Sequence, residues 1–252
     1  MCRLFGWAAT EAVTAEALLG PDLARLQQLS HVHADGWGEA WHGPQGVRLV
    51  KEDRPAYTSA VFAAAVSTHC AATGLLHLRW ATDNLPRCLP NTHPFVRGDV
   101  AFVHNGSIPR GRQLDDLIDT DVLATVDGDT DSERYFLALL SAYRRTGSAV
   151  KAFIDVTQAL HELAWPSLNA IWVQPGTLVA LAYHRPEHRP ADLPEHYYDL
   201  HYDHDGHVVT VWSEGVRTDP GTLLPNAHLL VATAADAAVR LVPLPDPQLT
   251  TV

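Results

Sequence analysis

Cys2 is the residue whose position most clearly suggests a chemical role, because it follows the initiator methionine directly in the opening stretch MCRLFGW. Removal of Met1 would give Cys2 a free α-amino group, whose ordinary pKa of about 7.7–8.0 lies close to neutral pH. Such an amine can accept the thiol proton and so activate the sulfur as a nucleophile. The alternative is that Cys2 is simply a small buried apolar residue.

Four polar clusters stand at or near the ends of apolar runs, where functional loops often begin. They are DGWG (35–38), HLRWAT (77–82), HNG (104–106) and GDTDSE (128–133). Each also has a structural interpretation. The first could be a tight turn, and Arg79 in the second could be a surface cation. The third could be a hairpin turn and the fourth a helix cap.

Together with Cys2, these clusters contain the groups needed to open an amide. The side-chain amide of Asn105 and the backbone N–H of Gly106 could stabilise a tetrahedral oxyanion. Arg79 could bind a carboxylate and Asp131 an ammonium, which are the two charged groups of an amino acid head. A lone arginine within an apolar strand also has an anionic partner more often than it has none.

The ordered motifs from Cys2 to about residue 133 resemble the glutaminase domain of class II glutamine amidotransferases, which are N-terminal nucleophile hydrolases. The resemblance implies that Cys2 is the nucleophile and that its own amine is the base. It also implies that Asn105 and Gly106 form the oxyanion hole. A weaker similarity is WSEG (212–215), where the family often has a serine–glutamate pair.

The resemblance further implies a set of substrate-binding residues. Arg79 would bind the substrate carboxylate, with Trp80 and Thr82 lining the pocket, and Asp131 would bind the α-ammonium. His93, in the stretch NTHPF, falls where the family often has a pocket histidine. The substrate would be a small molecule with a γ-glutamyl head, and no cofactor is implied.

The stretch HVHADGWG (31–38) departs from the His-Arg-Gly motif of amidotransferases fused to synthases. It is more similar to the stand-alone subgroup, which includes γ-glutamyl amidohydrolases of thiol metabolism. We expect one domain over residues 1–252, so the ammonia would reach a separate synthase subunit or be a by-product. Three functions stay open: glutamine hydrolysis, hydrolysis of a larger γ-glutamyl compound, and a catalytically silent subunit that binds a partner.

The composition limits which partners and which cellular compartment we expect for the protein. Eighteen Lys and Arg against 29 Asp and Glu give a net charge of −11, which disfavours nucleic acid and anionic membranes. Three cysteines without paired spacing predict a reducing cytoplasm and no zinc site. No signal peptide or spanning segment is evident. The histidines of LHYDHDGH (200–207) could suggest a metal site, but DHDG is typical of a turn.

The elements that must position these residues follow from hydrophobic periodicity. We predict strands at 2–9, 74–81 and 100–108, a hairpin over 167–184 that turns at Pro175-Gly176, and late strands at 207–214, 228–233 and 238–244. We predict helices at 21–29, 59–70, 129–147 and 148–164, and an exposed polar loop at 185–207. Strands early and late around two long helices indicate an α+β protein. The resemblance implies a four-layer αββα sandwich of two antiparallel sheets.

Overall fold

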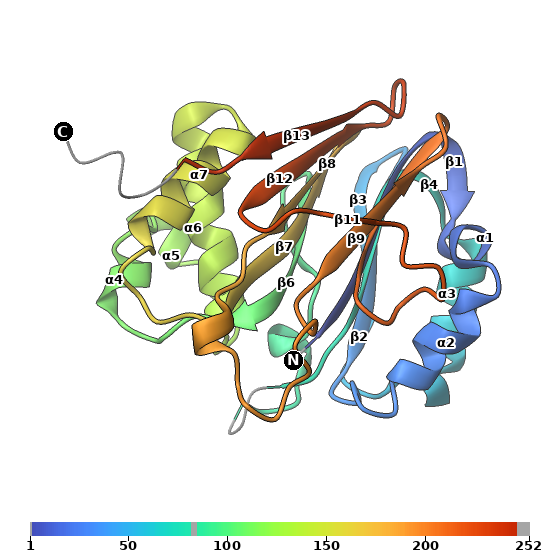
Figure 1. Cartoon of the computed structure of the whole chain (residues 1–252), viewed down its shortest axis with the longest axis horizontal. Helices are drawn as coiled ribbons and strands as arrows, with labels where there is room; N and C mark the ends of the chain where they lie inside the picture. Colours follow the sequence, from blue (N-terminus) through green and yellow to red (C-terminus); the bar gives the residue numbers. More distant parts are fainter. Residues whose placement is uncertain (1, 82–84, 246–252) are drawn as a thin grey trace.

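Two antiparallel sheets form the centre of the protein in the computed structural model, which describes residues 2–81 and 85–245 (Figure 1). The first sheet has seven strands in the order β11-β9-β10-β1-β4-β2-β3. Its strands are β1 (Arg3–Thr14), β2 (Trp37–Gly43), β3 (Gly46–Glu52), β4 (Cys70–Leu78), β9 (Leu200–His204), β10 (Val208–Ser213) and β11 (Thr222–Leu223).

The second sheet has six strands in the order β13-β12-β8-β7-β6-β5. Its strands are β5 (Phe95–Arg97), β6 (Val100–Ser107), β7 (Ser167–Gln174), β8 (Thr177–Ala182), β12 (His228–Thr233) and β13 (Val239–Pro243). All the pairings within both sheets are antiparallel.

Helices cover the outer face of each sheet, so that the layers run helix, sheet, sheet, helix (Figure 1). The first sheet is covered by α1 (Ala15–Leu19), α2 (Asp22–Leu29) and α3 (Ala60–Thr68). The second is covered by α4 (Arg112–Asp115), α5 (Thr120–Leu123), α6 (Asp131–Thr146) and α7 (Ala149–Ala159). This order of layers confirms the expected αββα sandwich.

No helix in the described part of the chain is long and apolar enough to cross a membrane.

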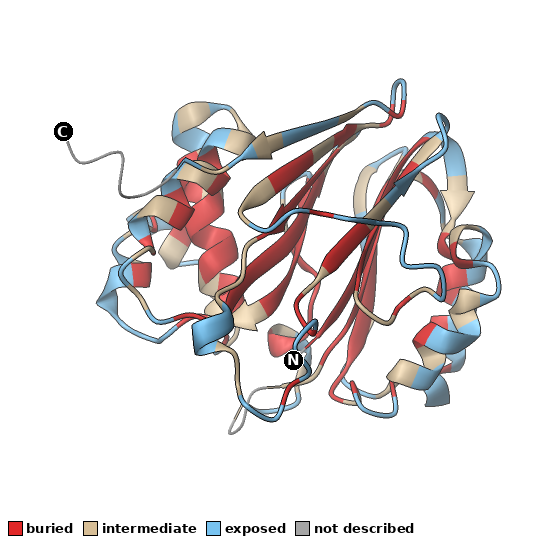
Figure 2. Ribbon diagram, viewed as in Figure 1, coloured by how far each residue is buried: buried red, intermediate tan, exposed pale blue. Residues whose placement is uncertain are grey.

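Three apolar cores fill the spaces between the layers, and the inner faces of both sheets are buried (Figure 2). The core between the sheets includes Leu4 and Leu75 from one sheet and Val103 and Ile171 from the other. Since side chains alternate along a strand, this core also fixes which neighbouring residues face the gap between the sheets.

The long helices and the central hairpin form where the sequence predicts them. Thr130 accepts a hydrogen bond from the backbone N–H of Glu133 and so caps α6, and Ser148 caps α7 in the same way. β7 and β8 flank Pro175-Gly176, as expected for the hairpin. α7 ends at Ala159, five residues before the predicted end.

Several strand predictions were wrong in extent. β1 begins at Arg3 and continues to Thr14, with an irregular register between Ala8 and Val13, where the polar end of the strand leaves the core. The hairpin of β2 and β3 was not predicted. Buried Glu39 interrupts the apolar pattern of β2, and its carboxylate lies 2.7 Å from Nδ1 of His69.

Residues 185–207 are not one exposed loop. They contain a short 3₁₀ helix at Pro186–His188 and strand β9, which pairs with β10 and β11. Leu193, Tyr197 and Tyr198 are buried there, although prolines and charged residues surround them in sequence. The apolar side chains are too widely spaced to give a periodic signal.

Candidate active site

Cys2 lies directly before β1 and is buried, with 8% of its surface exposed. Leu4, two residues further, belongs to the core between the sheets. Alternation along the strand therefore directs the side chain of Cys2 into the same gap. The backbone N–H of Leu4 donates to Oγ of Ser213 at 3.0 Å, which fixes the start of β1 against β10.

Asn105 approaches Cys2 from the opposite sheet. The backbone N–H of Cys2 donates to Oδ1 of Asn105 at 3.0 Å. Nδ2 of the same amide is buried and has no hydrogen-bond partner among residues 2–81 and 85–245. Buried amide donors are nearly always bonded, so an unbonded one beside a cysteine indicates a place for an acceptor from a ligand.

Gly106 follows Asn105 within strand β6, so this Asn-Gly pair is not the hairpin turn that the dipeptide could have formed. A Cβ atom at position 106 would lie 1.8 Å from the carbonyl oxygen of Ser167 on β7. Only glycine allows this approach. The residue is therefore required for the close pairing of β6 and β7 beside the cysteine.

The Cys2 thiol lies in an environment with opposing effects. Burial raises the pKa of the Cys2 thiol, and the guanidinium groups of Arg79 and Arg3 act in the opposite direction. The sulfur lies 3.8 Å from the carbonyl oxygen of Trp80, to which the thiol can donate. Trp80 is half-buried and lies at the end of the segment that follows β4.

Arg79 is buried with 2% of its surface exposed. Its guanidinium donates to two carbonyl oxygens, those of Asp35 at 3.3 Å and Pro86 at 3.4 Å. No carboxylate of the described residues lies within 4 Å of it to form an ion pair. Burial lowers the pKa of Arg79, yet an arginine remains charged in proteins. The site therefore holds a buried positive charge near the Cys2 sulfur.

The DGWG stretch supports the arginine rather than forming a simple turn. The backbone N–H of Asp35 donates to the carbonyl oxygen of Arg79 at 3.0 Å, and Oδ2 of Asp35 accepts from the backbone N–H of Ala81 at 2.8 Å. Trp37 and Gly38 are the first residues of β2. A Cβ atom on Gly38 would lie 2.4 Å from the carbonyl oxygen of His93, so this glycine admits the neighbouring loop.

Asp131 is the first residue of α6 and is half-buried. Its Oδ2 accepts a hydrogen bond of 2.6 Å from the backbone N–H of Ile108, two residues after Gly106. The helix cap is Thr130, so capping does not account for Asp131. Asp131 also lines a cavity of about 360 Å³ with Arg110, Arg112 and neighbouring residues, and neither Cys2 nor Arg79 is among the residues that line it.

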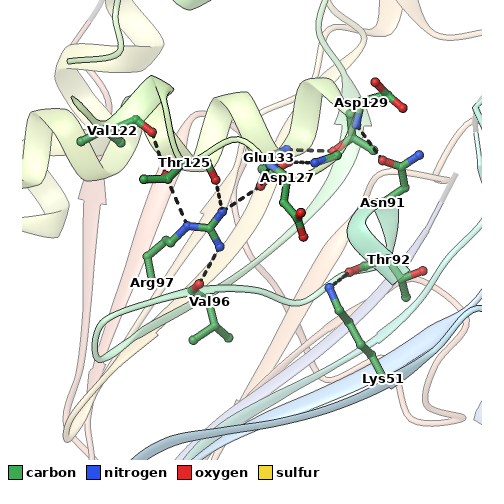
Figure 3. A network of polar contacts seen from close by, with 12 residues as sticks. Lys51, Asn91, Thr92, Val96, Arg97, Val122, Thr125, Asp127, Asp129 and Glu133 are labelled. Carbon is green, nitrogen blue, oxygen red and sulfur yellow. Dashed lines mark hydrogen bonds and ion pairs between the residues drawn. The ribbon is translucent and has the colours of Figure 1, made fainter. Parts of the chain in front are cut away.

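A network of buried polar contacts ties the loop before Asp131 to the segment beside Arg79. Oδ1 of Asn91 accepts from the backbone N–H of Asp129 at 2.7 Å (Figure 3). Nδ2 of Asn91 donates to the carbonyl oxygen of Pro86 at 3.2 Å, and this oxygen also accepts from Arg79. Asn91 therefore fixes the spacing between the two candidate recognition residues.

Glu133 organises the same loop from the helix side. Its carboxylate accepts from the backbone N–H groups of Asp127 and Gly128 and lies 3.0 Å from Nη2 of Arg97 (Figure 3). With 1% of its surface exposed, Glu133 is a structural acid in the GDTDSE motif. The same motif thus contains both a cap and a structural acid beside the half-buried Asp131.

His93 is buried and stacks on His77 of β4, with 4.2 Å between the ring centroids. Burial lowers the pKa of both histidines well below the ordinary value, so both are neutral at pH 7. Neither ring nitrogen of His93 has a hydrogen-bond partner in the described part of the chain. Thr82, another predicted pocket residue, lies outside the described residues.

The structure also shows residues near Cys2 that the sequence did not single out. Arg3 donates to the carbonyl oxygen of Cys2, and its guanidinium lies 4.2 Å from the ring centroid of Tyr197. Tyr197, Tyr198 and Leu193 form a small cluster against Trp80. These residues lack a recognisable motif, and only the tertiary fold brings segment 193–198 to the start of the chain.

The histidines of 200–207 do not form one metal-binding face. Asp205 and Gly206 make the turn between β9 and β10, as DHDG indicates. Nε2 of His201 lies 2.9 Å from the carboxylate of Glu214, the acid of the WSEG stretch. Glu214 therefore has a partner in β9, and Ser213 holds β1.

Two antiparallel sheets are covered on their outer faces by helices, and a candidate nucleophile at the start of β1 faces the gap between them. This arrangement defines a fold of the N-terminal nucleophile type. The family model described as "Glutamine amidotransferases class-II" matches residues 1–171. The chain belongs to this family.

Curated relatives match parts of the chain. The glutamine–fructose-6-phosphate aminotransferase of Tropheryma whipplei is 34% identical over 120 residues, which cover 46% of this chain and 18% of that protein. A protein of Haemophilus influenzae, named as a candidate glutamine amidotransferase, is 26% identical over 144 residues, which cover 55% of this chain and 47% of that protein. The chain thus spans less than half the length of either relative.

Solved structures share the fold over nearly the whole chain. A class-II glutamine aminotransferase domain protein from Silicibacter pomeroyi has a TM-score of 0.65 at 21% identity and covers 96% of this chain and 100% of its own. The glutamine phosphoribosylpyrophosphate amidotransferase of Bacillus subtilis has a TM-score of 0.64 at 16% identity and covers 97% of this chain and 49% of its own. At these identities the likeness establishes the fold.

Proposed function

We propose that the protein hydrolyses a γ-glutamyl amide, with glutamine as the default substrate, through a thioester on Cys2. The observation that carries the proposal is the position of Asn105. One end of its amide binds the Cys2 nitrogen, and the other end, Nδ2, has no partner among the described residues. A single side chain can thereby orient the base and stabilise a nearby oxyanion.

The proposed reaction begins after removal of Met1. The freed α-amine takes the thiol proton while the Cys2 sulfur forms a bond to the amide carbon. The carbonyl oxygen becomes an oxyanion bound by Nδ2 of Asn105 and the N–H of Gly106. The C–N bond then breaks, and the leaving nitrogen takes the proton from the α-ammonium. Water then adds to the thioester carbon, with the amine again taking a proton. The C–S bond breaks, the Cys2 sulfur takes that proton back from the α-ammonium, and glutamate is released.

The γ-glutamyl head would be held by charge. Arg79 offers a buried guanidinium that lacks a carboxylate partner in the described part of the chain, as a substrate carboxylate requires. Asp131 offers a half-buried carboxylate for the α-ammonium, and Asn91 links the loop before it to the segment beside Arg79. Trp80 and His93 would line the pocket, and the same role is proposed for Thr82.

The fate of the ammonia belongs to the same proposal. The relative from Tropheryma whipplei is named as a glutamine–fructose-6-phosphate aminotransferase, but the match covers 18% of that protein. We propose only the glutaminase half of such a reaction for this chain. A separate synthase subunit would accept the ammonia, or the ammonia would be released.

The test is hydrolysis of glutamine and of a series of larger γ-glutamyl amides by the purified protein. Cys2→Ala should abolish glutamate release and leave the free energy of unfolding nearly unchanged. Cys70→Ser and Cys88→Ser are matched controls at one exposed and one half-buried cysteine, and both should retain activity. Activity that survives Cys2→Ala would overturn the proposal.

A further inference from the structure

We propose that Arg3 is a positioning residue. Its guanidinium, stacked on the ring of Tyr197, holds the carbonyl oxygen of the N-terminal Cys2 and favours the basic, neutral form of the freed amino group. This inference rests on the proposed function, because it concerns the amine that would serve as base. It assigns a role to a residue that lies outside the motifs of the site.

The first part of the geometry is the contact of Arg3 with its neighbours. Nη1 of Arg3 donates to the carbonyl oxygen of Cys2 at 3.1 Å. The guanidinium stacks on Tyr197, 4.2 Å from the ring centroid, and only 8% of Arg3 is exposed. A guanidinium stacked on an aromatic ring is confined in both direction and distance. The carbonyl of Cys2 is therefore bound to a rigid group.

The second part connects the same tyrosine segment to the other end of Cys2. The Tyr197 and Tyr198 rings meet edge to face, with 5.3 Å between their centroids. The carbonyl oxygen of Tyr198 accepts a hydrogen bond from Nδ2 of Asn169. Asn169 lies directly opposite Asn105 in the register of β6 and β7, and Asn105 binds the nitrogen of Cys2.

These contacts surround Cys2 on both sides. Its nitrogen is held from the second sheet through Asn105, and its carbonyl oxygen is held through Arg3. Chain termini fray unless they are tied down. Once Met1 is removed, these two contacts hold the backbone of the terminal residue, while the thiol contacts the carbonyl oxygen of Trp80. Of the two backbone contacts, the one from Arg3 does not take part in the chemistry.

The charge of Arg3 adds a second effect. Among the described side chains, those of Arg79, Arg3, Tyr197 and Tyr198 interact electrostatically with the Cys2 thiol. Burial raises the pKa of both phenols, so they are neutral at pH 7 and leave two positive charges. A nearby cation disfavours the protonated amine and favours the thiolate. Arg3 therefore keeps Cys2 reactive at lower pH than it would be without this cation.

The experiment compares Arg3→Met and Arg3→Lys with the unaltered protein. Arg48→Met is the control, since Arg48 is an exposed cation on β3 of the same sheet. One measurement is kcat and KM for glutamine across pH 5.5–9. The other is the pH dependence of Cys2 alkylation by iodoacetamide, which requires no turnover.

Arg3→Met should raise the midpoint of alkylation and the acid limb of kcat/KM by about one pH unit, as loss of a close cation predicts. It should also lower kcat roughly 10- to 100-fold, because Cys2 is no longer held in one orientation. KM should change little, because the residues proposed to bind the γ-glutamyl head are unaltered. Arg3→Lys should restore the midpoints but recover kcat only in part, because lysine lacks the planar stack.

Unchanged midpoints and unchanged kcat in Arg3→Met, with hydrolysis intact, would overturn the role of Arg3. A merely structural role would lower the free energy of unfolding and leave both midpoints in place, which would also overturn it. If the unaltered protein does not hydrolyse any γ-glutamyl amide, the proposed function fails instead. The alkylation midpoints then still decide the effect of Arg3 on Cys2.

Discussion

Arg79 carries a buried charge that only carbonyl oxygens contact within the described part of the chain. A substrate carboxylate would supply the missing anion. Arg79→Lys keeps the charge but loses the two-pronged geometry. Loss of a charge-assisted contact costs about 1.5–3 kcal/mol, so we expect kcat/KM for glutamine to fall roughly 10- to 150-fold.

Steady-state kinetics check this prediction. Most of the effect should appear in KM, because the carboxylate is bound equally in the ground state and the transition state. A decrease confined to kcat would instead mean that Arg79 acts on the thiol.

Asp131 allows a cleaner test, because asparagine preserves one of its contacts. In Asp131→Asn the side-chain oxygen can still accept from the backbone N–H of Ile108, while the negative charge is lost. We expect a higher KM for glutamine and loss of discrimination against an analogue without the α-amino group. The measurement is the ratio of kcat/KM for the two compounds. An unchanged ratio would restrict Asp131 to its bond with Ile108.

At the residue scale, motif residues were predictable from sequence and supporting residues were not. The unusual position of Cys2 and the Asn105-Gly106 pair could be identified because each combines a rare place with a specific chemistry. Arg3 and Asn169 were missed because an arginine in an opening strand and an asparagine in an apolar strand have no fixed spacing to the site. Only the sheet register brings Asn169 opposite Asn105.

At the scale of elements, Asn91 connects the loop beside Arg79 to the loop before α6. Its side chain is fully buried and uses both an acceptor and a donor. Asn91→Asp retains the acceptor for Asp129 but loses the donor to Pro86 and buries a charge. Asn91→Ala loses both bonds and leaves a cavity.

We expect Asn91→Ala to lower the free energy of unfolding by about 1–3 kcal/mol and to raise KM for glutamine. Denaturant titration and kinetics measure the two effects. The cap variant Thr130→Ala is the control, since it weakens α6 without touching Asn91. The comparison is the increase in KM for a given decrease in the free energy of unfolding. If this is the same in both variants, Asn91 has no separate role in spacing the site.

The strands show where periodicity fails as a guide. The helices α6 and α7 have long amphipathic patterns and polar caps, so their existence was predictable. β2 was missed because a buried carboxylate paired with His69 lies in its middle. β9 was missed because only Leu200 and His201 of its five residues are buried, and its pairing with β10 depends on a distant strand order.

At the scale of the whole molecule, three buried histidines set a pH limit on stability. Burial lowers the pKa of His77, His93 and His104 in the folded protein. The unfolded chain has histidines with a pKa near 6.5 and binds more protons below that value. The free energy of unfolding therefore falls as pH drops below about 6.5, and is unaffected by these groups above it.

Each such histidine contributes a loss of up to about 1.4 kcal/mol per pH unit. Urea titrations at pH 7.5, 6.5 and 5.5 should show stability falling between the last two. His93→Gln should have a shallower fall in stability with pH than the unaltered protein. Equal slopes in the two proteins would mean that His93 becomes protonated in the folded state.

Cys2, freed of Met1, is the proposed nucleophile for a γ-glutamyl substrate. The most direct measurement is intact-mass and peptide analysis after treatment with a diazo-ketone analogue of glutamine. We predict loss of Met1, one adduct per chain on Cys2, and protection by excess glutamine or by the preferred γ-glutamyl amide. Label on Cys70 or Cys88 would rule out Cys2 as the nucleophile, and full activity in protein that retains Met1 would rule out its α-amine as the base.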